Sequence, residues 1–93
     1  MIEIASEILR KEKKYYLYIL ICADGTLYTG ITVNLDRRLQ EHNSSKHGAK
    51  YTRARRPVKL VYSKEFCNRV EAAKEEWRIK SLSKSAKLDL INI

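Results

Sequence analysis

The chain has few of the residues that mark several protein classes. Its 93 residues include two cysteines, one proline and three glycines. These counts exclude collagen-like and low-complexity chains, and the lack of a Cys-x-x-Cys pair or a Cys/His cluster argues against structural zinc. No apolar run approaches the ~20 residues of a membrane span, and acidic residues precede basic ones at the N-terminus, the reverse of a secretory signal. We therefore expect a cytoplasmic protein with reduced and partly buried thiols at Cys22 and Cys67.

The length and the charge indicate a small domain that meets a polyanion. A chain of 93 residues with 44% hydrophobic and 32% charged residues is expected to form one folded domain with an economical core. Nineteen Lys and Arg against eleven Asp and Glu give a net charge of +8. Such an excess favours nucleic acid as the partner over an acidic membrane surface.

The order of apolar and polar residues predicts a small α+β fold. Residues 15–22 are apolar on both alternating faces, which is typical of a central strand covered on both sides. The other expected elements are a short helix within 1–14, strands over 26–32 and 58–66, and helices over 34–42, 68–82 and from 83 or 85 onward. We therefore expect a three-stranded β-sheet flanked by helices in residues 15–93, preceded by an N-terminal helical extension over 1–14.

Most of the net charge lies between residues 44 and 69. This segment holds eight basic residues against Glu65 alone, and it lacks helical or strand periodicity up to residue 56. Basic side chains neutralise phosphates, and an aromatic ring stacks on a base. We expect nucleic-acid binding rather than a functionless solvated loop, and Gly48 is expected to let the backbone approach the ligand. The binding residues that we expect are Lys46, Lys50, Tyr51, Arg53, Arg55 and Arg56.

Four spaced residues precede this segment and resemble a known active site. Tyr18 lies within Leu17-Tyr18-Ile19, Tyr28 begins Tyr28-Thr29-Gly30, and Arg38 and His42 lie one turn apart on the next predicted helix. This order resembles the GIY-YIG nuclease domain, most closely the small stand-alone proteins of that family. The stretch over 48–53 and the helix over 68–82 extend the resemblance across residues 15–91.

The resemblance implies a Mg²⁺-dependent endonuclease that hydrolyses DNA, with RNA left open as a substrate. It implies site roles for Tyr18, Tyr28, Arg38 and His42, and a metal-binding glutamate on the helix over 68–82. It also implies products with a 5′-phosphate and a 3′-hydroxyl. Since the catalytic core and the basic segment use nearly the whole chain, we expect selection of nucleic-acid structure rather than of sequence.

The chemistry of these side chains suits phosphodiester cleavage. The fork of Arg38 matches two phosphate oxygens, and a single Mg²⁺ held by one carboxylate keeps most of its waters. A tyrosine with a pKa of about 10 is a poor base, so a cation or a proton relay has to assist it. We assign Tyr18 as the base, or as a relay to one, and Tyr28 as the group that orients phosphate or water, although the resemblance leaves open which tyrosine removes the proton. His42 either tunes Tyr18, donates to the phosphate, or caps its helix.

Three glutamates on the helix over 68–82 compete as the metal ligand. On a helical wheel Glu75 falls inside the apolar stripe, and Glu71 lies at the edge of that stripe. Glu76 is the third candidate ligand. A carboxylate in an apolar stripe is costly unless a cation satisfies it, so we expect Glu75 to hold the metal. The alternative for Glu75 is a structural ion pair with Arg38 or Lys80.

The turn between the first two strands decides whether the two tyrosines share one face of the sheet. A strict two-residue turn at Asp24-Gly25 pairs Tyr28 with Ile21 and places it on the face opposite to Tyr18. A shared active site therefore predicts a three- or five-residue loop, or a β-bulge.

Two other functions are compatible with the sequence. A nucleic-acid-binding module with little or no turnover uses the same basic segment, and an accessory subunit uses residues 1–14 to dock on a larger protein complex. We also expect a monomer or weak dimer without membrane contact, and core positions for Trp77 and Phe66.

Overall fold

The structure, a computed structural model, describes residues 14–92. Three strands form one sheet in the order β2-β1-β3, and both strand pairs are antiparallel. The elements are β1 (Tyr15–Ile21), β2 (Leu27–Thr32), α2 (Leu35–Ser44), α3 (Lys50–Arg53), β3 (Lys59–Phe66), α4 (Arg69–Lys80) and α5 (Lys84–Ile91). The expected α+β fold with a three-stranded sheet is therefore confirmed, while the helix expected within 1–14 lies outside the described residues apart from Lys14. None of the helices in residues 14–92 is long and apolar enough to cross a membrane.

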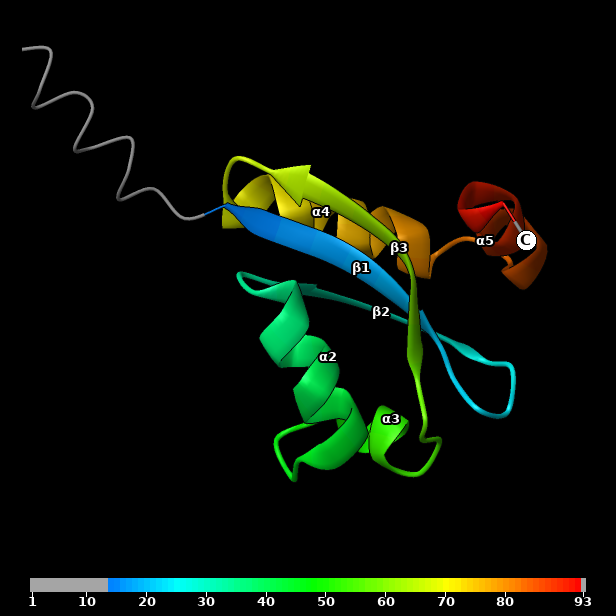
Figure 1. The fold of residues 1–93 in the computed structure, drawn as a ribbon. Helices are drawn as coiled ribbons and strands as arrows, with labels where there is room; N and C mark the ends of the chain where they lie inside the picture. The colour runs from blue at the N-terminus through cyan, green and yellow to red at the C-terminus, as the bar shows by residue number, and fades with distance from the viewer. Residues whose placement is uncertain (1–13, 93) are drawn as a thin grey trace, which may run out of the picture.

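Strand β1 lies at the centre of the sheet and is covered on both faces. On one face Leu17 and Ile19 are fully buried and pack with Ile79 of α4 and Ile91 of α5. On the other face Tyr18 and Leu20 belong to a second cluster, against which α2 packs. Figure 1 shows α4 on one side of the sheet and α2 and α3 on the other. The unbroken apolar run of β1 is thus explained by burial on two sides.

The β1–β2 hairpin has the odd loop that a shared tyrosine site requires. Tyr18 pairs with Gly30 and Leu20 with Tyr28, so Tyr18 and Tyr28 lie on the same face of the sheet. The backbone N–H of Cys22 donates to Thr26 O at 2.8 Å, and the N–H of Gly25 donates to Cys22 O at 2.9 Å. Gly25 has a φ of 83°, a left-handed conformation that glycine adopts without steric cost. These bonds close a three-residue loop, which confirms the register prediction.

Side-chain caps fix where the three longer helices begin. The carboxamide of Asn34 accepts from the N–H of Arg37, that of Asn68 accepts from Glu71, and the hydroxyl of Ser83 accepts from Ala86. Each cap satisfies a backbone donor that the first turn of a helix leaves without a partner. The single helical turn α3 interrupts the basic segment that precedes β3.

Two expectations about burial are wrong. Trp77 is 75% exposed, because α4 faces the sheet with Ala72 and Ile79, both fully buried. At 3.6 residues per turn Trp77 lies about 140° around the helix from Ala72, so its ring points away from the sheet. Cys67 is exposed in the bend before α4, whereas Cys22 is buried, and both thiols are free. Phe66, by contrast, packs against the core cluster.

Candidate functional site

A hydrogen bond between Tyr18 and His42 forms the centre of the candidate site. Tyr18 extends from β1, and His42 reaches it from the last turn of α2. The Tyr18 hydroxyl lies 2.7 Å from His42 Nε2, with Tyr18 2% exposed and His42 fully buried. The structure therefore gives His42 a partner inside the domain, so His42 is not an exposed helix cap.

Aromatic rings connect this buried pair to the surface. The ring centroid of Tyr28 lies 5.2 Å from that of His42 and 6.4 Å from that of Tyr18. Tyr51 of α3 stacks on Tyr28 at 6.0 Å, and the guanidinium of Arg55 lies 3.8 Å from the centroid of Tyr51. Tyr51 is 38% exposed, so the row of rings runs from the buried tyrosine to the basic segment. The two tyrosines and the basic segment thus belong to one continuous region.

The guanidinium of Arg38 lies near the Tyr18 hydroxyl, and its positive charge favours the ionised form of Tyr18. The same guanidinium donates through Nη1 to Glu41 Oε1 and to the backbone oxygen of His47, each at 2.9 Å. These contacts hold the Arg38 side chain, which is 26% exposed, with its fork at the mouth of the site. A fixed guanidinium in this place is suited to bind an anionic phosphate.

Burial dominates the electrostatics of Tyr18. It raises the pKa of Tyr18 to about 12, and the nearby guanidinium of Arg38 opposes that rise. The nearby Tyr28 and the negative charge of Glu76 also contribute to the rise. Tyr18 therefore holds its proton in the free protein, and any reaction that uses it needs a coupled acceptor for that proton.

Glu75 and Glu76 of α4 have different surroundings. Both carboxylate oxygens of Glu75 accept from Arg78, at 2.7 and 2.8 Å, and the positive charges of Arg78 and Lys64 lower the pKa of Glu75. Glu76 forms an ion pair with Lys80 at 3.2 Å, and its side chain is 24% exposed. The carboxylate whose charge reaches Tyr18 is that of Glu76. The effect of its charge on the pKa of Tyr18, together with a lysine as its partner, favours Glu76 over Glu75 as the carboxylate of this site.

The basic residues expected to bind nucleic acid fall into two groups. Lys46, Lys50 and Arg53 are exposed. Arg55 pairs with Asp24 at 3.1 Å while it covers Tyr51. Arg56 is part-buried, and its guanidinium donates to the backbone oxygens of Glu41, His42 and Ser45 at the end of α2. Arg56 thus closes the C-terminus of α2, a structural role that the sequence pattern did not indicate.

Two glycines allow the close contacts around the site. A Cβ on Gly30 of β2 would lie 2.6 Å from the Tyr18 hydroxyl, so only glycine leaves room for this side chain across the strand. A Cβ on Gly48 would lie 2.5 Å from Glu41 O and 2.9 Å from His42 Cα. The space that Gly48 provides is therefore filled by α2, and the expectation that it admits a ligand is wrong.

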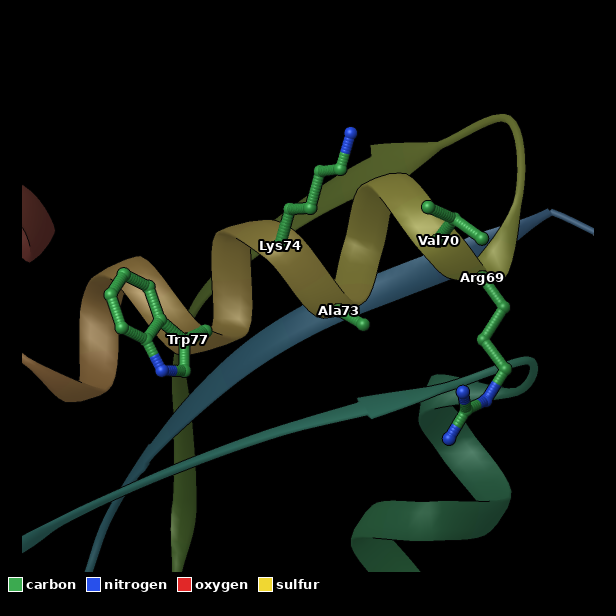
Figure 2. A pocket seen from close by; sticks show the side chains of 5 residues that line it. All are labelled: Arg69, Val70, Ala73, Lys74 and Trp77. Atoms are coloured by element: carbon green, nitrogen blue, oxygen red, sulfur yellow. The ribbon is translucent and has the colours of Figure 1, made fainter.

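An exposed groove lies on the outer face of α4, and it includes none of the tyrosines. Figure 2 shows the side chains that line it, with the Trp77 ring standing out from the helix. The lining residues are Arg69, Val70, Ala73, Lys74 and Trp77.

The buried His42 predicts a pH dependence of stability. Burial, assisted by the charge of Arg38, lowers the pKa of His42 from 6.5 to about 4. The unfolded chain therefore binds a proton at higher pH than the folded chain does, so stability is full above pH 6.5 and falls as the pH drops towards 4. A shift of this size corresponds to roughly 3 kcal/mol at the acidic end.

Urea unfolding of a His42→Gln variant between about pH 4.5 and 6.5 measures this dependence, because most carboxylates stay ionised in that window. The slope of stability against pH should flatten in His42→Gln and persist in His47→Gln, since His47 is exposed. Equal slopes in wild type and His42→Gln would contradict the assignment.

Comparison with known proteins identifies a family and several relatives. Residues 14–89 match the family described as the GIY-YIG catalytic domain. A UPF0213 protein of Desulfotalea psychrophila is 57% identical over 77 residues, which cover 83% of this chain and 70% of that protein. A UPF0213 protein of Syntrophus aciditrophicus is 56% identical over 78 residues, which cover 84% of this chain and 90% of that protein.

Two solved structures are also similar to this chain. The solution NMR structure of a UPF0213 protein from Bacillus halodurans is 44% identical, has a TM-score of 0.56, and covers 85% of this chain and 83% of its own. A protein from E. faecalis, also solved by NMR, is 44% identical with a TM-score of 0.57. These relatives are small proteins, as expected from the resemblance to stand-alone members. The chain belongs to the GIY-YIG catalytic domain family, a family of nucleases.

Proposed function

We propose that this protein is a Mg²⁺-dependent endonuclease that hydrolyses DNA and selects it by structure rather than by sequence. The observation that carries the proposal is the Tyr18–His42 hydrogen bond. It lies near the Arg38 guanidinium and next to the Tyr28 ring, on which Tyr51 stacks. A proton donor and acceptor, a phosphate-binding cation and a stacking surface thus meet in one place. Phosphodiester hydrolysis needs the first two, and the stacking surface serves to bind the nucleic acid.

The proton path follows from the two shifted pKa values. With Tyr18 at about 12 and His42 at about 4, the proton stays on Tyr18 in the free protein. A bound phosphodiester brings negative charge next to His42 and favours the imidazolium. Tyr18 then accepts a proton from the attacking water as it gives its own proton to His42 Nε2. One proton leaves water and one arrives on His42, so the relay is balanced.

The remaining groups of the site bind and orient the substrate. Arg38 neutralises the charge that develops on the phosphate oxygens, with its fork already held by Glu41 and the His47 carbonyl. Tyr28 lies against both His42 and Tyr51 and orients the phosphate or the water. Fixed donors of this kind add to the rate because they need no rearrangement during the reaction.

A single carboxylate, that of Glu76, fits a Mg²⁺ site here. No three His, Cys, Asp or Glu side chains gather into a metal cage within residues 14–92, which argues against a closed site. Mg²⁺ keeps several waters and is commonly held by one or two carboxylates plus substrate phosphate. Glu76 is partly exposed, and its partner is a single lysine. When bound, the ion would act as a Lewis acid at the phosphate and the leaving oxygen.

Nucleic acid would reach this site along the basic segment. Lys50 and Arg53 of α3 and the preceding Lys46 are exposed, and the Arg55 guanidinium stacks on the Tyr51 ring. Lysine and arginine neutralise the backbone phosphates, while an aromatic ring under a guanidinium accepts a base without reading its identity. These contacts suit structure selection, and they serve RNA as well as DNA.

A cleavage assay tests the proposal. The wild-type chain is incubated with labelled single-stranded, duplex, nicked and flapped DNA, and with a matched RNA, in Mg²⁺ or in EDTA. We expect Mg²⁺-dependent cutting of at least one DNA structure, with 5′-phosphate and 3′-hydroxyl ends on the products. Binding with a steep salt dependence but without cutting would identify a binding module instead.

A further inference from the structure

Thr52 is a buried side chain next to the site to which the proposed reaction assigns no role. It lies in α3 and is fully buried. Its Oγ1 lies 2.8 Å from Nδ1 of His42, on the side of the ring that faces away from Tyr18. The same Oγ1 lies 2.9 Å from the backbone oxygen of Ala49. A continuous row of hydrogen-bonded atoms therefore joins Tyr18, His42, Thr52 and the Ala49 carbonyl.

The Ala49 carbonyl fixes the direction of these hydrogen bonds. A carbonyl oxygen only accepts, so it receives the proton of Thr52. The Thr52 oxygen has then given away its only proton, so it accepts from His42 Nδ1 at 2.8 Å. On the other side of the ring, His42 Nε2 lies 2.7 Å from the Tyr18 hydroxyl and is left to accept the proton of Tyr18.

This direction leaves one arrangement for the imidazole. Nε2 accepts from Tyr18, so the ring proton of neutral His42 is on Nδ1 and is donated to Thr52 Oγ1. The backbone N–H of Ala49 also approaches Nδ1, but at 3.4 Å this contact is longer than an ordinary hydrogen bond. Burial keeps His42 neutral at pH 7, with a pKa of about 4, which is consistent with one ring proton.

We infer that Thr52 is a positioning residue that holds His42 in the Nδ1–H tautomer, with Nε2 open to take the proton of Tyr18. The inference rests on the proposed function for its catalytic meaning, but the tautomer itself is a property of the free protein. In the opposite tautomer Nε2–H would point at the Tyr18 oxygen and could not accept its proton. Thr52 also accepts from Nδ1–H after His42 becomes imidazolium, so no further proton has to move.

The test is ¹⁵N NMR of the histidine rings at neutral pH, in the full-length chain. The chain has two histidines, and a His47→Gln variant assigns the signals of His42. We expect a protonated-type shift for Nδ1 and an unprotonated-type shift for Nε2. The opposite pair of shifts in the wild type would overturn the inference, whether or not the protein cuts DNA.

Two substitutions at Thr52 test its part in this tautomer. Thr52→Val keeps the shape of the side chain but removes the hydroxyl, so Nδ1 is left beside the Ala49 N–H and the ring should move towards the Nε2–H tautomer. Thr52→Ser keeps the hydroxyl and should keep the wild-type shifts. If Thr52→Val retains the Nδ1–H tautomer, Thr52 does not hold that tautomer. If Thr52→Val does not fold, the inference is tested by the shifts of the wild type and of Thr52→Ser, and an Nε2–H tautomer in either protein would overturn it.

Cleavage rates give the second readout. If the protein is a nuclease, Thr52→Val should lose roughly 10²-fold or more in rate, the loss expected when a proton acceptor is misaligned. Thr52→Ser should restore most of that loss. Wild-type NMR shifts as expected together with no cleavage by any form would refute the proposed function and leave the tautomer assignment standing. A full rate in Thr52→Val with the tautomer changed would refute the positioning role.

Discussion

A Tyr18→Phe variant is expected to cleave DNA roughly 10²–10⁴-fold more slowly than the wild type, the range for loss of a positioned proton-transfer group. The substitution removes only the hydroxyl, which lies 2.7 Å from His42 Nε2 and near the positive charge of Arg38. The ring stays in its buried place, so the fold and the DNA-binding surface are retained. Single-turnover cleavage with Mg²⁺ measures the effect, and DNA binding measured in EDTA should match that of the wild type.

Tyr62→Phe is the matched control for this change. Tyr62 pairs with Ile19 and packs on the opposite face of the sheet, against the Leu17–Ile19 cluster. The same atom is removed there without touching the site, so the cleavage rate should stay at the wild-type value. A Tyr18→Phe variant as active as Tyr62→Phe would remove Tyr18 from the reaction.

A Glu76→Gln variant is expected to lose about 10²-fold or more in Mg²⁺-dependent cleavage, because a Lewis-acid metal contributes several kcal/mol to the transition state. The negative charge of Glu76 reaches Tyr18, and its carboxylate is partly exposed with Lys80 as its partner. Raising the Mg²⁺ concentration should recover part of the rate, since a weakened site is refilled by mass action. Cleavage rates measured against Mg²⁺ concentration give both the loss and the recovery.

Glu75→Gln provides the comparison, because it removes the same charge from the neighbouring position. Glu75 is held by Nε and Nη2 of Arg78, and solvent around the half-exposed Arg78 side chain limits what this ion pair contributes to stability. We expect Glu75→Gln to cleave at close to the wild-type rate with an unchanged Mg²⁺ requirement. The reverse order, with Glu75→Gln inactive and Glu76→Gln active, would return the metal to the residue that the sequence favoured.

Features that depend on local sequence could be predicted. The continuous apolar run of 15–22 indicates a strand buried on both faces, and β1 lies at the centre of the sheet. The requirement that Tyr18 and Tyr28 share a face predicted an odd hairpin loop, because side chains alternate along a strand. Asn68 followed three residues later by Glu71 is typical of a helix start, and Asn68 caps α4. In each case the residues that decide the outcome are close together in the chain.

Features that depend on how the elements pack could not be predicted. A helical wheel placed Glu75 in an apolar stripe, and its side chain is 15% exposed, but the wheel did not show that Arg78 pairs with it or that Trp77 lies on the exposed side of α4. Thr52 lies ten residues from His42, and nothing in their spacing indicates a bond between them. Arg56 resembles a phosphate-binding residue in sequence, yet it bonds the backbone of α2. Distant contacts of this kind are set by tertiary packing alone.

The proposed active site is tested most directly by single-turnover cleavage of the preferred DNA structure. The protein is in excess, and Mg²⁺ is either added or removed by EDTA. We expect the wild type to cut only with Mg²⁺, and Tyr18→Phe and Glu76→Gln to bind the same DNA but leave it intact over the same time. Wild-type protein that binds the DNA and leaves it intact in Mg²⁺ would contradict the nuclease assignment. Cutting that persists in both variants would contradict the site.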